Sequence, residues 1–152
     1  MTPHGDQSHM LHALSEAEAA AARGEVPIGA VIVGPDGAFL AAAGNRTREL
    51  NDPTAHAELL AIRAACARLG SERLSNCDLY VTLEPCPMCA AAISFARIRR
   101  LYYGASDPKG GGVEHGARIF NHPTCHHAPE LYPGIDDARA AELLRTFFQG
   151  KR

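Results

Sequence analysis

The chain lacks the features that define several large classes of protein. No apolar run in its 152 residues approaches the ~20 residues that a membrane-spanning helix needs. Its first ten residues are too polar for a signal peptide. We therefore expect a cytoplasmic protein with no membrane partner.

Basic charge is also scarce. The formal net charge is −2, which excludes a generally basic nucleic-acid-binding protein, because phosphate binding depends on clustered lysine and arginine. Contact with phosphate would have to rely on local groups of cations. These are Arg46 with Arg48, Arg97 with Arg99 and Arg100, and Lys151 with Arg152. Taken singly, each is better explained as solvated surface charge.

No repeat, low-complexity tract or linker divides the chain. Hydrophobic residues make up 46% and charged residues 21%, which is ordinary for a globular protein. A chain of this length buries about 70% of its unfolded surface. We predict one domain spanning residues 1–152.

Helices are expected at residues 9–23, 87–95 and 136–148. A further helix is expected to begin after an N-cap at Asp52 or Thr54 and to end at Leu69. The strands are expected at 28–33, 38–43, 79–83, 98–103 and 130–132, with a glycine-rich loop at 107–112. Strands that alternate with helices predict an α/β sandwich. The early hairpin, followed by strand–helix–strand crossovers, predicts a mixed sheet.

The five cysteines are an odd number, and two of them form a C-x-x-C pair. In a reducing compartment such a pair is more often a metal or redox site than a disulfide. Cys66 lies in an alanine-rich helical run and is best explained as a buried apolar residue. For Cys77 and Cys125 the sequence decides nothing.

Two short motifs suggest chemistry. His56 and Glu58 lie two residues apart near the start of one predicted helix, and Cys86 and Cys89 lie three apart at the start of another. One imidazole and two thiolates can hold zinc and leave the fourth position open for water, as catalytic zinc sites do. This H-x-E…P-C-x-x-C order is typical of nucleobase and nucleoside deaminases. Glu58 would take the proton of the water and pass it to the ring nitrogen and the departing ammonia.

The C-x-x-C pair is also compatible with a closed structural metal site or with a thiol redox pair. A closed structural site would need a fourth protein ligand, and further histidines are present at positions 115, 122, 126 and 127. A thiol redox pair would need neither His56 nor Glu58. The order of the residues and the proline before Cys86 favour the deaminase interpretation.

The residues around these motifs resemble the bacterial tRNA adenosine deaminases, within the cytidine-deaminase-like superfamily. The resemblance extends from Glu25 to about Phe148. Its main stretches are EVPIGAV (25–31), GNR (44–46), DPTAHAE (52–58), LYVTLEPCPMC (79–89), ARI (96–98) and GASDPKGG (104–111). The metal motif belongs to the whole superfamily, whereas the DPTAHAE and DPKGG versions point to the narrower family.

The resemblance implies a three-layer α/β/α sandwich with a mixed five-stranded sheet, a homodimer, a Zn²⁺ cofactor, and conversion of the wobble adenosine of a tRNA anticodon to inosine. It also implies that Asn45 hydrogen-bonds the flipped base and that the backbone N–H of Glu84 touches the attacked site. Asp107 would contact the backbone or sugar of the anticodon loop, and Val26 would offer an apolar face to the base. Such a base is already single-stranded, so it is extruded at modest cost.

A deaminase of a free nucleobase (guanine or cytosine) or of a small heterocycle is the alternative, with the same zinc and Glu58. Residues 113–118 depart from the pattern of the family, and Glu114 adds negative charge close to where RNA should pass. A non-catalytic zinc-binding domain is a further alternative, but it would have no need of Glu58. The histidine-rich segment 122–127 has no assigned role.

Overall fold

The protein is described by a computed structural model, which covers residues 6–150; the predicted cation pair Lys151 and Arg152 lies outside this range. In chain order the elements are α1 (Gln7–Ala22), β1 (Gly29–Val33), β2 (Phe39–Gly44), α2 (Ala57–Leu69), β3 (Asp78–Leu83), α3 (Pro87–Ala96), β4 (Arg100–Ala105), the 3₁₀ helix η1 (Ile119–Asn121), β5 (Glu130–Tyr132) and α4 (Asp137–Gln149).

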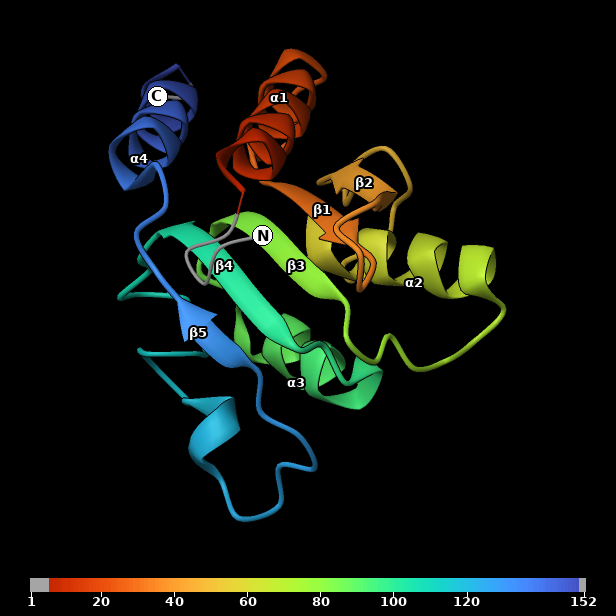
Figure 1. The fold of residues 1–152 in the computed structure, drawn as a ribbon. Coiled ribbons are helices and arrows are strands. Elements are labelled where there is room, and N and C mark those ends of the chain that lie inside the picture. Colours follow the sequence, from red (N-terminus) through yellow and green to blue (C-terminus); the bar gives the residue numbers. More distant parts are fainter. Residues whose placement is uncertain (1–5, 151–152) are drawn as a thin grey trace.

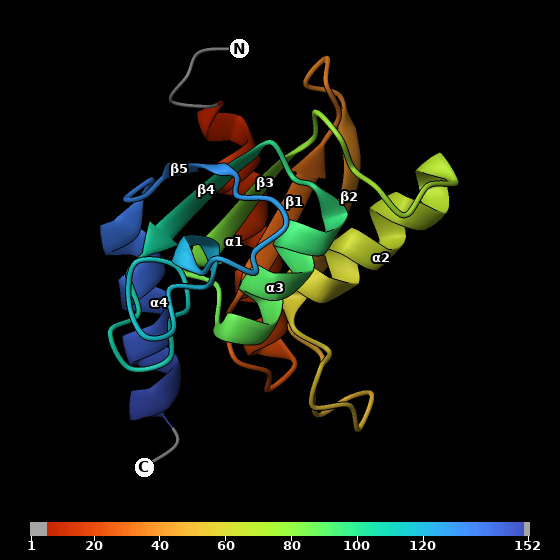
Figure 2. The same cartoon turned by 90° about the horizontal axis from the view of Figure 1, so that it is seen from below.

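The strands form one five-stranded sheet in the order β2-β1-β3-β4-β5. The β2–β1 and β1–β3 pairs are antiparallel, whereas β3–β4 and β4–β5 are parallel. Helices α1 and α4 cover one face of the sheet and α2 and α3 cover the other (Figures 1 and 2). The three-layer sandwich with a mixed sheet is therefore confirmed.

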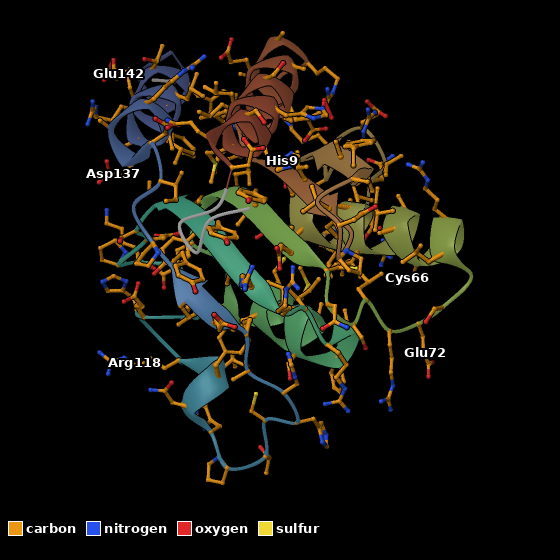
Figure 3. All side chains as sticks on the ribbon, in the orientation of Figure 1. His9, Cys66, Glu72, Arg118, Asp137 and Glu142 are labelled. Carbon is orange, nitrogen blue, oxygen red and sulfur yellow. The ribbon has the colours of Figure 1, made fainter. Side chains whose placement is uncertain are left out.

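The central strands are buried on both faces, and alternate side chains enter different cores. On β1, Ala30 and Ile32 belong to the core beneath α2 and α3, while Val31 and Val33 belong to the core beneath α1 and α4. Charged side chains such as Glu72, Arg118 and Glu142 are exposed on the outside of the molecule (Figure 3). Within the described part of the chain, no helix is both long and apolar enough to cross a membrane.

Two predicted boundaries were wrong. The N-cap of α2 is His56, because the Asp52 side chain accepts hydrogen bonds from the N–H and hydroxyl of Thr54 and so forms a separate turn before the helix. Strand β4 begins at Arg100 and runs through Gly104. The N–H of Ile98 still donates to Ile93 O at the end of α3, at 3.3 Å, which keeps residue 98 out of the strand.

Helix α1 packs unusually close to the sheet. A Cβ atom on Gly29 would lie 1.9 Å from the backbone oxygen of Ala13 and 2.7 Å from the backbone nitrogen of Ala17. A Cβ on Gly44 would lie 2.8 Å from the backbone oxygen of Glu16. Glycine at these two positions thus lets the helix backbone touch β1 and β2 directly.

We expect Gly29→Ala to lower the free energy of unfolding by about 2 kcal/mol or more, because the new methyl group forces the helix and the strand apart. Chemical denaturation measures this change. Gly150→Ala is the matched control, because a Cβ there would make only ordinary contacts, with 3.6 Å as the nearest distance. Equal stability of the two variants would contradict the close packing of α1.

Candidate metal centre

Helices α2 and α3 begin at the same place, and the N-cap residue of each is a predicted ligand. His56 caps α2 and Cys86 caps α3, both with extended backbone and neither with a side-chain capping bond. Pro87 then occupies the first turn of α3, where its missing N–H costs nothing. Both ligands therefore sit where helix dipoles favour negative charge.

The ligand atoms converge. Nδ1 of His56 lies 3.6 Å from Sγ of Cys86 and 3.5 Å from Sγ of Cys89, and the three atoms lie within 4.8 Å of one another. Across residues 6–150, no fourth His, Cys, Asp or Glu joins this group. The cluster can hold a metal ion with three protein ligands, which is the arrangement of an open site.

The pKa values of the two thiols, Cys86 and Cys89, are shifted in opposite directions. Hydrogen bonding with the Cys89 thiol is the main cause that lowers the pKa of Cys86 to about 4, and His56 lowers it further. The same hydrogen bond, together with burial, raises the pKa of Cys89. Without a cation, the shared hydrogen bond therefore favours one thiolate and one thiol. This donor set fits a soft-ligand metal such as zinc.

Glu58 lies beside the cluster in the first turn of α2 and is 3% exposed. Its carboxyl group interacts with the Cys89 thiol, and Oε1 has no hydrogen-bond partner among the described residues. Burial raises the pKa of Glu58 to about 7. A buried acid with a free oxygen and a pKa near neutrality is suited to accept and return a proton.

Asn45 follows β2 and is 4% exposed. Its backbone is held by a bond from its N–H to Ile28 O and by one from Arg23 to its carbonyl, while Oδ1 has no partner in the described range. The next residue, Arg46, donates its N–H to Ala55 O, which places this segment against the turn before His56. An unpartnered buried acceptor beside the cluster is available to a ligand.

The other predicted substrate contacts differ in their local surroundings. Val26 is half-buried just before β1. The backbone N–H of Glu84 donates to Ala105 O at 2.8 Å, so it would have to share or leave that bond to reach a substrate. Asp107 Oδ1 accepts from the N–H groups of Lys109 and Gly110, as in a turn-forming aspartate.

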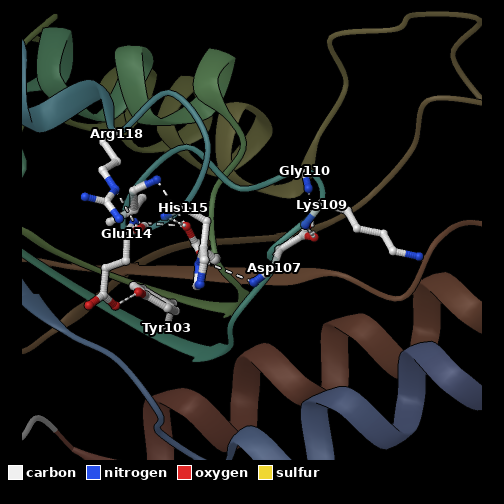
Figure 4. A network of polar contacts seen from close by, with 9 residues as sticks. Tyr103, Asp107, Lys109, Gly110, Glu114, His115 and Arg118 are labelled. Atoms are coloured by element: carbon white, nitrogen blue, oxygen red, sulfur yellow. Dashed lines mark hydrogen bonds and ion pairs between the residues drawn. The ribbon is translucent and has the colours of Figure 1, made fainter.

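The sequence analysis missed the side chain of Glu84. Its carboxylate is fully buried and accepts four backbone N–H bonds from the segment 107–115, and it pairs with His115 at 2.7 Å. Asp107, Glu114 and His115, which supply three of these N–H groups, are labelled in Figure 4. Burial opposes its ionisation, but these hydrogen bonds outweigh burial and lower its pKa. The only sequence clue was an acidic residue between an apolar strand and Pro85.

The arginine groups differ in their relation to the cluster. Arg46 and Arg48 lie in the loop after Asn45, close to the turn that carries His56. Arg97, Arg99 and Arg100 follow the end of α3, about 15 Å along the helix from Cys86. Arg99 is also paired with Asp78 at 3.0 Å. Of these two groups, Arg46 and Arg48 lie nearer to the cluster, and Arg46 is itself paired with Glu49 at 2.6 Å.

Comparison with known proteins identifies the family of this chain. The family model of the cytidine and deoxycytidylate deaminase zinc-binding region matches residues 3–105. A tRNA-specific adenosine deaminase of Agrobacterium fabrum is 64% identical over 148 residues, which are 97% of this chain and 97% of the relative. A solved tRNA:A34 deaminase structure, from studies of A-to-I editing at the wobble position of transfer RNA, is 65% identical with a TM-score of 0.90, over 91% of this chain and 100% of that chain. A solved guanine deaminase from Bacillus subtilis is 44% identical with a TM-score of 0.65, over 67% of this chain and 65% of that chain. The chain therefore belongs to the bacterial tRNA adenosine deaminase family, a branch of the cytidine and deoxycytidylate deaminases.

Proposed function

We propose that this protein converts the wobble adenosine of a tRNA anticodon to inosine by zinc-dependent hydrolytic deamination. The observation that carries the proposal is the convergence of His56, Cys86 and Cys89 beside a buried glutamate with a free oxygen. The 64% identity to a tRNA-specific adenosine deaminase over nearly the whole chain supports the choice of substrate. We expect the protein to act in the cytoplasm, as one domain.

His56, Cys86 and Cys89 would hold the zinc ion. When bound, zinc with such ligands lowers the pKa of a coordinated water toward ~7 and so supplies a nucleophile at neutral pH. Because metal ligands must be deprotonated and the site is formed only in the folded chain, metal binding is coupled to folding.

Glu58 would move the protons. Its carboxylate accepts a proton from the attacking water and returns it to a ring nitrogen of adenine as the new C–O bond forms at C6. The remaining proton of the new C6 hydroxyl then passes through the Glu58 carboxylate to the amino nitrogen. The C6–N bond breaks, and the amino group leaves as ammonia. The free Oε1 and the pKa near neutrality support this role.

The remaining contacts would position the nucleotide. Asn45 would hydrogen-bond the extruded base through its unpartnered Oδ1, and Val26 would pack against the base. The backbone N–H of Glu84 would approach the attacked site. Asp107 would contact the backbone or sugar of the anticodon loop, and Arg46 and Arg48 would hold its phosphates.

We also propose a homodimer. The resemblance to the family implies it, and Phe95 on the outer face of α3 is an apolar side chain that is 66% exposed. It borders a hollow lined by Leu59, Ile62 and Ala92 and by the charged residues Arg63, Glu72, Arg73 and Arg97, which a second copy would cover. Light scattering of the purified protein tests the oligomeric state.

Deamination of free guanine or cytosine is the second candidate. The 44% identity to a guanine deaminase and the acidic Glu114 near the site favour it.

We expect the zinc-loaded protein to form inosine in an anticodon stem-loop with adenosine at the wobble position, and to leave free guanine, cytosine and adenosine unchanged. Ammonia release from a free base, without inosine in the RNA, would keep the zinc chemistry and overturn the tRNA assignment.

Glu58→Gln should lower kcat by about 10²–10⁴-fold, because the amide cannot carry the proton. Zinc content and the unfolding midpoint should stay close to wild type, since the side chain keeps its shape. Glu142→Gln, which changes an exposed carboxylate on α4, across the sheet from the cluster, serves as the control. Substantial residual turnover in Glu58→Gln would exclude Glu58 as the proton carrier.

Cys86→Ser should lose zinc and stability together, because the metal is bound only by the folded site. Elemental analysis and thermal unfolding measure the two effects. Cys66→Ser is the matched control, since Cys66 is a free, half-buried cysteine on α2 and is not part of the cluster. A Cys86→Ser protein with full zinc content and wild-type stability would remove Cys86 from the ligand set.

A further inference from the structure

The carboxylate of Glu84 has an unusual set of partners. It is 0% exposed, and Oε1 accepts the N–H of Asp107 at 3.0 Å. Oε2 accepts the N–H groups of Val113, Glu114 and His115 at 3.2, 3.0 and 3.0 Å. Nδ1 of His115 lies 2.7 Å from Oε1. All of these partners belong to one segment, residues 107–115, which we call the 107–115 loop.

The 107–115 loop also lies flush against the turn that carries Cys86. A Cβ on Gly111 would lie 2.4 Å from Oε2 of Glu84, and a Cβ on Gly112 would lie 2.5 Å from the backbone nitrogen of Pro87. The N–H of Gly112 donates to Pro85 O at 2.8 Å. The two glycines thus let the loop backbone reach both the buried carboxylate and the metal-ligand turn.

The outer part of the loop is directed toward solvent. Lys109 is exposed and extends away from the network, and no ion pair is found for it within residues 6–150 (Figure 4). Asp107 closes its own turn with the N–H groups of Lys109 and Gly110. A cation and a polar turn are therefore presented next to the metal cluster, where an anionic strand would pass.

We propose that Glu84 is a positioning residue whose carboxylate fixes the 107–115 loop on the metal-ligand turn, so that Asp107 and Lys109 are presented to the RNA substrate. The part of this inference that concerns RNA rests on the proposed function. An ionised carboxylate suits the role because it accepts several N–H bonds at once. Glutamine offers one acceptor oxygen and turns its NH₂ group toward N–H donors, which leaves several of them unpaired.

Glu84→Gln tests the proposal in two independent ways. In hydrogen exchange, peptides that cover the 107–115 loop should exchange about tenfold faster or more, while peptides from β1 and β3 keep their wild-type rates. In kinetics with the anticodon stem-loop, KM should rise about tenfold and kcat should stay within about threefold. Zinc content should not change, because no ligand is altered.

Gly111→Ala provides a second variant that leaves Glu84 intact and pushes the loop off its carboxylate. It should reproduce both effects. Gly150→Ala is the matched control, because it lies outside the loop and a Cβ there would make only ordinary contacts, with 3.6 Å as the nearest distance. It should have near-wild-type exchange and KM.

The outcomes separate the role of Glu84 from the identity of the substrate. Unchanged exchange of the 107–115 loop in both Glu84→Gln and Gly111→Ala would overturn the positioning role, whatever the substrate is. Faster loop exchange with an unchanged KM for RNA would overturn the presentation of the loop to RNA. Absence of inosine formation by the wild-type protein would overturn the proposed function, while the exchange measurement would still decide the role of Glu84.

Discussion

The structure depends on the meeting of two helix N-termini at one point. His56 and Cys86 are each the N-cap of a helix, and Cys89 lies in the first turn of α3. This meeting requires α2 and α3 to lie on the same face of the sheet, and it requires β3 to end where α2 begins. The mixed strand order provides both conditions, because the antiparallel hairpin leads into α2 and the parallel β3–β4 crossover contains α3.

Three buried glutamates, Glu25, Glu58 and Glu84, have different roles around the cluster. Glu25 accepts the N–H groups of Arg48 and Glu49 and so holds the loop after Asn45. Glu84 holds the 107–115 loop in the same way. Both are satisfied acceptors with structural effects. Glu58 is buried to a similar extent, but one of its oxygens has no partner in the described range, and that oxygen is free for chemistry.

The elements and the ligands were predictable because each follows from a local pattern. Apolar strands, the glycine turns, and the H-x-E and C-x-x-C spacings are all visible in the sequence, and the structure brings His56, Cys86 and Cys89 together as expected. The N-cap of α2 was mistaken because Asp52 and Thr54 satisfy each other. The Glu84 network was not predicted because its donors are backbone N–H groups more than twenty residues away. Nearly every residue has such a group, so residue types do not show which of them will donate.

Three protein ligands would leave one position of the metal open to water. X-ray absorption spectroscopy at the zinc edge of the zinc-loaded protein tests it most directly. An open site predicts two sulfur neighbours at ~2.3 Å, with one nitrogen and one oxygen at ~2.0–2.1 Å. Four protein ligands, for example with a second imidazole in place of the light oxygen neighbour, would contradict it and make the site structural.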